Sequence, residues 1–199
     1  MRVCVIGTGY VGLVTGVCLS HIGHEVICID NNADKVKLMQ SGQSPIFEPG
    51  LSELMQSSME AGRLTFTTDL AAGVSHGDIL FIAVGNHPMP TGESESRYVE
   101  AVARGIGEHL IGGYKVIVNK STVPIGSGDW VRMIVMDGIA ERQQVPVGAG
   151  APADKPETPP FDVVSNPEFL REGSAVHDTF NPDRIVLGGS NPKAIAMMK

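Results

Sequence analysis

Three glycines with regular spacing are the first residues of this chain that could bind a ligand. Gly7, Gly9 and Gly12 form a GxGxxG pattern between an apolar run and a helix-like stretch. In a dinucleotide-binding fold, the first glycine permits a tight turn, the second lets a pyrophosphate approach the backbone, and the third lets helix and strand pack closely. The helix start then offers unpaired amides to the phosphates. The pattern predicts a dinucleotide site, although such a turn also occurs for structural reasons alone.

Asp30 indicates which dinucleotide this turn would bind. A carboxylate at the end of the second strand hydrogen-bonds ribose hydroxyls and repels a 2′-phosphate. Asn31 and Asn32 follow it and provide no guanidinium for such a phosphate. NAD is therefore favoured over NADP, and FAD or another adenosine cofactor stays open.

A pair of hydroxyls follows a later apolar run. Ser121 and Thr122 come directly after residues 115–119, where a parallel strand would end and doubly wound sheets bind their ligands. A hydroxyl there could donate a hydrogen bond to a reacting oxygen. The alternative is an ordinary turn from strand to helix, with Pro124 near the helix start.

The stretch SNPEFLREG, residues 165–173, contains two glutamates, Glu168 and Glu172. Asn166, Pro167 and Glu168 are of the types that start a helix: a capping side chain, a first-turn proline and an acid that the helix dipole favours. We therefore expect a turn of helix to begin here. Capping explains Glu168 but not Glu172, which leaves Glu172 as a candidate for chemistry.

Alternating strand-like and helix-like runs must position these residues. We expect strands at 2–6, 25–30, 64–67, 79–84, 115–119, 162–165 and 185–187. We expect helices at 11–22, 33–41, 51–61, 99–110 and 127–140, and a short one from 192. This alternation indicates an α/β fold with a doubly wound, mostly parallel Rossmann-type sheet and helices on both faces. The proline-rich residues 142–160 predict a long loop.

Length and charge limit the classes of protein that fit. The chain has 199 residues and a net charge of −7, which suits a single domain 1–199 and argues against a nucleic-acid partner. Its apolar runs fall short of the roughly 20 residues that span a bilayer. The opening MRVCVIG has no signal-peptide pattern. We therefore expect neither nucleic acid nor a membrane among its partners.

Cys4, Cys18 and Cys28 are the three cysteines of the chain. An odd number without metal-ligand spacing indicates a reducing compartment, so we expect a cytoplasmic protein with no metal site. Free cysteines usually pack as small apolar residues. We expect all three in the core and none as a catalytic thiolate.

Several motifs together resemble one family. These are GTGYVGLVTG, SPIFEPGLSELM, FIAVG, KSTVPIG, SNPEFLREGSAVHD and NPDRIVLGG. They are similar to motifs of the nucleotide-sugar 6-dehydrogenases, and REG…PDRIVLG resembles the UDP-glucose branch. The resemblance covers the whole chain. It implies oxidation of the sugar C6 alcohol to a carboxylate in two NAD-dependent steps, through a thioester on a catalytic cysteine.

The same resemblance implies roles for individual residues. As catalytic residues it implies Thr122, Glu168 and Glu172, with Glu172 in the general-base region for water attack on the thioester. As NAD contacts it implies Gly7, Gly9, Tyr10, Val11, Gly12, Asp30, Lys35, Gly85, Asn86, Ser121, Thr122 and Glu172. As substrate contacts it implies Glu168, Phe169, Leu170, Arg171 and Glu172. By itself, Lys35 would be read as a solvated helix lysine, and Glu48-Pro49-Gly50 as a structural turn.

Two departures from the family pattern stand out. Asn86 occupies the place of a threonine near the NAD ribose, and His87 that of a proline. The family's cysteine motif, its lysine, its dimerising central helix and its substrate domain have no counterpart up to Lys199. We therefore expect a fragment of a longer, homodimeric UDP-glucose enzyme that binds NAD but does not turn over. A sister enzyme for GDP-mannose or UDP-N-acetylmannosamine, or a stand-alone NAD-binding module, are the alternatives.

Overall fold

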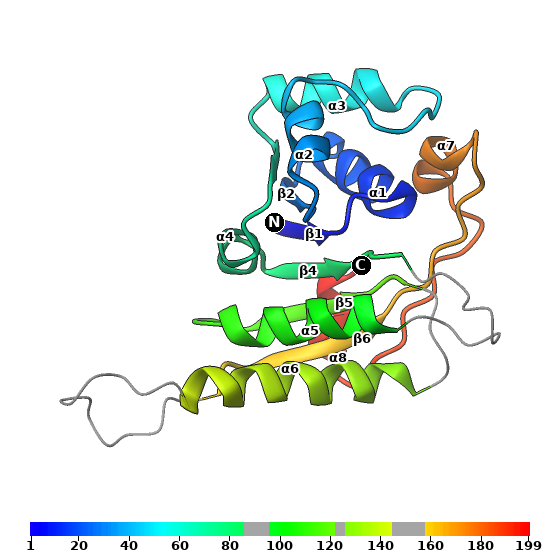
Figure 1. Ribbon diagram of the computed structural model, residues 1–199. Coiled ribbons are helices and arrows are strands. Elements are labelled where there is room, and N and C mark those ends of the chain that lie inside the picture. Colours follow the sequence, from blue (N-terminus) through cyan, green and yellow to red (C-terminus); the bar gives the residue numbers. More distant parts are fainter. Residues whose placement is uncertain (86–95, 122–125, 145–157) are drawn as a thin grey trace, which may run out of the picture.

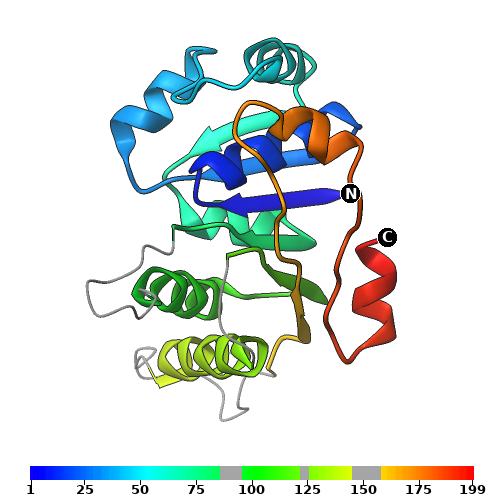
Figure 2. The ribbon, with the colours of Figure 1, turned by 90° about the vertical axis from the view of Figure 1, so that its right-hand side faces the viewer.

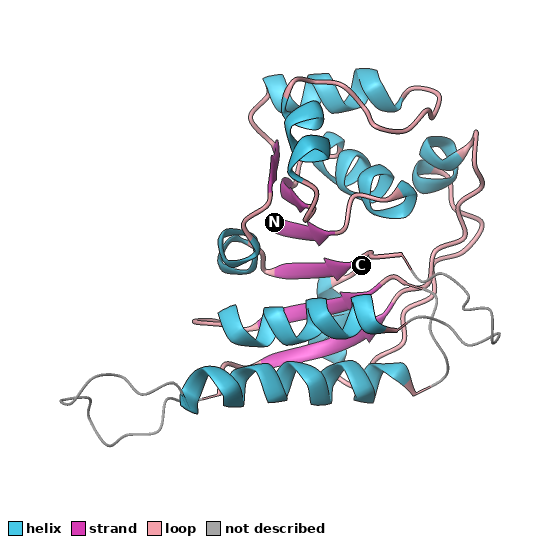
Figure 3. Cartoon of the chain, viewed as in Figure 1, coloured by secondary structure: helices cyan, strands magenta, loops and turns pink. Residues whose placement is uncertain are grey.

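The structure, a computed structural model, describes residues 1–85, 96–121, 126–144 and 158–199 (Figure 1). The strands in these ranges are β1 (Arg2–Ile6), β2 (Glu25–Ile29), β3 (Leu64–Thr67), β4 (Ile79–Ile82), β5 (Lys115–Asn119) and β6 (Phe161–Ser165). The helices are α1 (Tyr10–His21), α2 (Ala33–Gln40), α3 (Leu51–Glu60), α4 (Leu70–His76), α5 (Arg97–His109), α6 (Ser127–Gln144), α7 (Ala175–Phe180) and α8 (Pro192–Met197). Figure 3 separates the two kinds of element by colour.

The strands of the described ranges form one parallel sheet in the order β3-β2-β1-β4-β5-β6. This is the doubly wound order in which the chain starts at the centre, builds outward to one edge, and then returns to build the other half. The central strands β1 and β4 are almost entirely apolar and buried, as expected of parallel strands covered on both faces. The predicted fold class is confirmed.

Helices cover both faces of the sheet, each with its own apolar core. Val3 and Val5 of β1 point into a core shared with α1, α2, α3, α7 and α8. Cys4 and Ile6 point the other way, into a core shared with α4, α5 and α6. Figure 2 shows α8 on the opposite side of the sheet from α5 and α6. Because parallel strands point the same way, the C-terminal ends of all the strands lie along one edge of the sheet, which we call the carboxyl edge.

The predicted helix start at Asn166 is wrong. Residues 166–170 form no helix, and α7 begins only at Ala175. The Asn166 backbone N–H donates to the Asn119 carbonyl (2.9 Å), and its side chain donates to the Val186 carbonyl (3.0 Å). Asn166 therefore extends the line of β6 and does not cap a helix.

The predicted strand at 185–187 is also wrong. The only pairing near it within the described residues is an isolated antiparallel bridge between Ser165 and Gly188. Ile185 is 67% exposed, so its apolar side chain does not belong to a sheet interior. The chain here passes the end of β6 and contacts it through the Ser165–Gly188 bridge.

Other boundaries moved by a few residues. Helix α6 continues to Gln144, so the predicted loop begins later than residue 142, and residues 145–157 lie outside the described part. Helix α4 was not predicted, although Asp69 caps it by accepting the Ala72 backbone N–H (3.0 Å). Strands β2 and β4 stop at Ile29 and Ile82, which leaves Asp30 just beyond β2.

All three cysteines are buried, as predicted. Burial raises the pKa of the Cys4 thiol to about 12 and that of Cys18 to about 11, and it also raises the pKa of Cys28. Among the helices that the structure describes, none is long and apolar enough to cross a membrane. The same residues contain no group of His, Cys, Asp and Glu side chains suited to a metal ion.

Candidate active site

The glycines of the phosphate turn, residues 7–12, meet three different requirements. Gly7 has φ +96°, and a Cβ there would lie 2.7 Å from the Ala83 carbonyl oxygen. A Cβ on Gly12 would lie 1.9 Å from the Gly7 carbonyl oxygen. A Cβ on Gly9 would meet nothing within 4 Å. Packing therefore requires Gly7 and Gly12 to be glycine, whereas Gly9 borders open space from which a ligand can approach.

Helix α1 starts at this turn with its amides free for an anion. Gly9 is the N-cap and has no side chain to accept a hydrogen bond from the first turn, which also contains no acidic residue. The exposed N–H groups and the positive end of the helix dipole favour a phosphate. The turn therefore fits the pyrophosphate of a dinucleotide.

Asp30 lies beside this turn and is held in place by three residues. Its carboxylate accepts the Thr8 backbone N–H (3.1 Å) and hydroxyl (2.5 Å), the Asn32 N–H (3.0 Å) and the Lys35 ammonium (2.9 Å). Burial works to raise the pKa of Asp30, but these hydrogen bonds outweigh it and hold the pKa below its ordinary value. The carboxylate thus stays charged next to the turn, where it can accept ribose hydroxyls.

For two of these partners of Asp30, the structure shows a role that the sequence did not predict. Lys35 is not a freely solvated lysine, because its side chain is 24% exposed and pairs with Asp30. Thr8 was not predicted as a site residue, yet it is fully buried and gives Asp30 two hydrogen bonds. Its position between Gly7 and Gly9 was the signal that could have indicated this role.

The ends of β4 and β5 are joined at the same edge of the sheet. The Ser121 hydroxyl donates to the Val84 carbonyl oxygen (2.9 Å), next to Gly85. Ser121 therefore contacts the strand end that leads to the predicted cofactor residues. Thr122 and Asn86, which the sequence also assigns to the site, lie outside the described residues.

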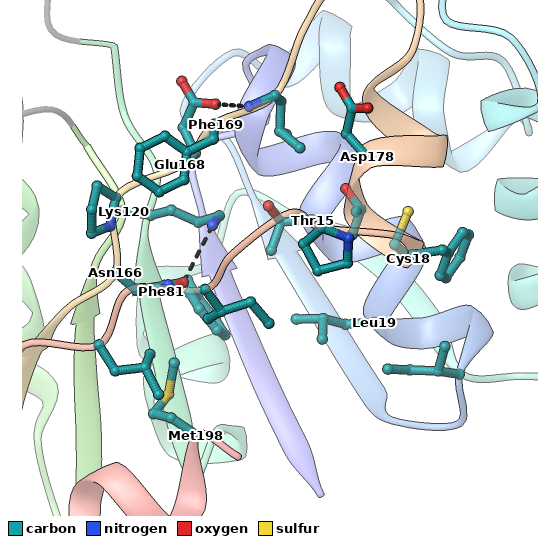
Figure 4. A pocket seen from close by; sticks show the side chains of 18 of the residues that line it. Thr15, Cys18, Leu19, Phe81, Lys120, Asn166, Glu168, Phe169, Asp178 and Met198 are labelled. Carbon is teal, nitrogen blue, oxygen red and sulfur yellow. Dashed lines mark hydrogen bonds between the residues drawn. The ribbon is translucent and has the colours of Figure 1, made fainter.

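Lys120 is a partly buried cation at this edge. Its ammonium donates to the Asn166 side-chain oxygen at 3.3 Å (Figure 4). Burial lowers the pKa of Lys120, and the charge of Glu168 opposes that shift. Lys120 was not predicted as a site residue, although it directly precedes Ser121.

Glu168 to Arg171 form an extended segment beyond β6. The Glu168 carboxylate accepts the Leu170 backbone N–H (2.6 Å), and the Arg171 guanidinium bonds Asp178 (2.7 Å). Phe169 is 54% exposed, and the Arg184 guanidinium lies 5.6 Å from its ring centre. The predicted substrate contacts therefore form one continuous stretch, with Phe169 and Arg171 exposed to solvent.

A cavity of about 540 Å³ opens beside this segment (Figure 4). Helix α1 contributes Thr15, Cys18 and Leu19 to its wall, and Phe81 lies in its floor on β4. The polar groups that line it include Lys120, Asn166, Glu168 and Asp178. The cavity is large enough for a small organic ligand.

Glu48 connects the phosphate turn to the segment after Glu172. It is 4% exposed, and its carboxylate accepts the Tyr10 hydroxyl and the backbone N–H groups of Gly173 (2.9 Å) and Ala175 (2.7 Å). Burial, the hydrogen bond to Glu48 and the Glu172 charge raise the pKa of Tyr10 to about 12. Predicted cofactor and catalytic residues thus lie on either side of one buried carboxylate.

Comparison with known proteins identifies one family of dehydrogenases. A family model described as "UDP-glucose/GDP-mannose dehydrogenase family, NAD binding domain" matches residues 1–199. The UDP-glucose 6-dehydrogenase TuaD of Bacillus subtilis is 47% identical over 198 residues, covering 100% of this chain and 39% of its own length. The UDP-glucose 6-dehydrogenase of Rhizobium meliloti is 45% identical, covering 100% of this chain and 42% of its own.

Two solved structures share the fold at 36–38% identity. A GDP-mannose dehydrogenase from Pseudomonas aeruginosa superposes with a TM-score of 0.85 at 36% identity, covering 100% of this chain and 43% of that one. A UDP-glucose dehydrogenase from Pyrobaculum islandicum gives 0.85 at 38% identity with the same coverage, 100% and 43%. The chain spans about two fifths of the length of the curated relatives it matches.

Proposed function

Since the chain belongs to the UDP-glucose/GDP-mannose dehydrogenase family, we propose that it is the NAD-binding domain 1–199 of an enzyme that oxidises UDP-glucose to UDP-glucuronate. The observation that carries this proposal is the phosphate turn beside Asp30, at the sheet edge to which Glu168–Glu172 also return. UDP-glucose is taken from the names of the relatives, which are 45–47% identical. The complete enzyme would be a cytoplasmic homodimer that works through a cysteine thioester.

In this proposal, the residues of the chain bind and orient the two reactants. The amides of α1 and Gly9 hold the pyrophosphate, and Asp30 holds the adenosine ribose. NAD, when bound, accepts the hydride. The backbone from Phe169 to Arg171 holds the sugar nucleotide, with Glu168 fixed by its bond to the Leu170 N–H (2.6 Å).

The catalytic assignments concern Thr122, Glu168 and Glu172. Glu172 is exposed, so its carboxylate can accept a proton from a water molecule at the sheet edge. The backbone directly after Glu172 is fixed, because the Gly173 N–H donates to the Glu48 carboxylate (2.9 Å). Thr122 would donate to the reacting sugar oxygen, and Lys35, Gly85, Asn86 and Ser121 would complete the cofactor contacts, with Tyr10 and Val11 in the turn.

A sister activity on GDP-mannose is the second candidate. A GDP-mannose dehydrogenase and a UDP-glucose dehydrogenase fit this fold equally well, with TM-scores of 0.85. The fold of the NAD-binding domain is therefore compatible with either substrate. Only the sequence motifs and the named relatives favour UDP-glucose. A stand-alone NAD-binding module would show NAD binding without any effect of a sugar nucleotide.

The test has two parts. Calorimetry on this chain should show binding of NAD and at least about tenfold weaker binding of NADP, since the charged Asp30 carboxylate repels the 2′-phosphate. The protein encoded by the complete gene should then reduce NAD with UDP-glucose in preference to GDP-mannose and UDP-N-acetylmannosamine. Preference for GDP-mannose would establish the sister activity, and absence of NAD binding would refute the proposal.

A further inference from the structure

Three segments that are far apart in the sequence meet at the Glu48 carboxylate. Tyr10 is the first residue of α1, Glu48 lies between α2 and α3, and Gly173 and Ala175 flank the start of α7. Oxygen Oε2 of Glu48 accepts the Tyr10 hydroxyl and the Gly173 N–H (2.9 Å), and Oε1 accepts the Ala175 N–H (2.7 Å). Glu48 therefore ties the helix of the phosphate turn to the residue directly after Glu172, and the Tyr10 hydroxyl also accepts the Gly173 N–H directly (3.2 Å).

The environment of Glu48 makes these bonds hard to exchange. The residue is 4% exposed, and a buried carboxylate needs hydrogen-bond donors to remain charged. Burial works to raise the pKa of Glu48, but the Tyr10 hydroxyl and the amides of Gly173 and Ala175 outweigh it and lower the pKa. Since the group stays charged, its bonds to the two amides persist in the absence of a ligand.

We propose that Glu48 is a positioning residue that couples the phosphate turn to the catalytic segment around Glu172. When a dinucleotide orders the first turn of α1, the Tyr10 hydroxyl is fixed, and Glu48 then holds Gly173 and Ala175 more firmly. The position of Glu172 follows from that of its neighbour Gly173. This inference rests on the proposed function, because the coupling needs a dinucleotide at the turn.

Amide hydrogen exchange of this chain, followed by NMR at saturating NAD, measures the coupling directly. In the wild type, NAD should slow exchange of the Gly173 and Ala175 amides by about fivefold or more, the size of an ordinary coupling between sites. The Ala72 amide, which donates to the capping Asp69 side chain of α4 (3.0 Å), is a control that should not respond. Any change in NAD affinity is measured separately by calorimetry.

Two variants separate coupling from simple support. Tyr10→Phe removes only the hydroxyl, which also accepts the Gly173 N–H (3.2 Å), so the informative amide is that of Ala175. The Ala175 amide, which donates to Glu48 (2.7 Å), should keep its slow exchange without NAD but lose most of the further slowing by NAD. Glu48→Gln turns one acceptor oxygen into a donor, so at least one of the two amides should exchange faster even without NAD. If Tyr10→Phe retains the full NAD effect, the coupling is overturned, even where Glu48→Gln fails to fold.

Failure of the proposed function gives a different result. If the wild-type chain binds NAD but neither the Gly173 nor the Ala175 amide responds, the coupling alone is refuted. If the wild-type chain does not bind NAD, the proposed function is refuted, and the coupling with it. A response of both amides that Tyr10→Phe abolishes supports the inference.

Discussion

At Asp30, one carboxylate serves both the fold and the proposed cofactor. It accepts bonds from Thr8, Asn32 and Lys35, which fix its direction and keep it charged. A carboxylate held in this way loses little freedom when it binds a ribose, so its hydrogen bonds contribute more to affinity. The pairing with Lys35 also keeps an uncompensated charge away from the pyrophosphate.

Asp30→Ala should weaken NAD binding by about 10- to 100-fold, because a hydrogen bond to a charged group contributes about 1.5–3 kcal/mol. Calorimetry on both forms measures the change. Asp34→Ala is the matched control, since the Asp34 side chain is 97% exposed in the first turn of the neighbouring helix α2, and it should leave affinity unchanged. Equal affinity of Asp30→Ala and wild type would contradict the cofactor assignment.

Glu48 should also shape the acid stability of the domain. Its folded-state pKa lies below the ordinary value of 4.5, so below about that pH the unfolded chain takes up a proton that the folded chain does not. The stabilisation is complete above this range and is lost as pH falls through the folded pKa. Urea midpoints from pH 7 to pH 3 should therefore show Glu48→Gln less stable at pH 7, with the gap to wild type closing in acid. A constant gap would contradict this linkage.

The site residues that the sequence could predict are those whose partners lie close to them along the chain. The phosphate turn and Asp30 follow from local spacing, because a strand, a turn and a helix fix their relative positions. Glu48 bonds residues 38, 125 and 127 positions away, and no local pattern encodes such a meeting. The short turn after it therefore gave only a structural interpretation.

At the scale of elements, capping signals were informative only where no other partner competed. Asn166 has the right type for an N-cap, but the Val186 carbonyl and the neighbouring strand end use its hydrogen bonds. Asp69 does cap α4, and the helix was missed because it is short and contains a glycine. The parallel strands were predicted well, since burial on both faces gives them continuous apolar runs.

The contact between α1 and β1 gives a matched pair of glycine variants. Gly12→Ala should destabilise the domain by about 1–3 kcal/mol or more, because its methyl group would overlap the Gly7 carbonyl, 1.9 Å from the new Cβ. Gly9→Ala has open space around the new Cβ and should fold almost normally, while its methyl group blocks the approach of the pyrophosphate. Thermal unfolding and NAD calorimetry on both variants separate the effects. Loss of stability in Gly9→Ala with NAD binding retained would contradict both assignments.

At the scale of the whole molecule, the proposed ligand contacts lie at the carboxyl ends of the strands, and one apolar core packs against each face of the sheet. The phosphate turn lies at the C-terminal end of β1, and Ser121 and Asn166 follow β5 and β6 at the same edge. Fold class alone predicted this arrangement. The identity of the sugar nucleotide is not fixed by the fold, because a GDP-mannose enzyme and a UDP-glucose enzyme match it with equal TM-scores of 0.85.

The last prediction concerns turnover by the 199-residue chain. Thioester chemistry needs an accessible thiolate, and Cys4, Cys18 and Cys28 are all buried with raised pKa values. The purified chain should therefore bind NAD but form no UDP-glucuronate from UDP-glucose, as followed by chromatography of the sugar nucleotide. Bacillus subtilis TuaD, of which this chain covers 39%, serves as the active control under the same conditions. UDP-glucuronate formation that is lost in Asp30→Ala would show that this chain carries a complete catalytic site, and would overturn the cysteine argument.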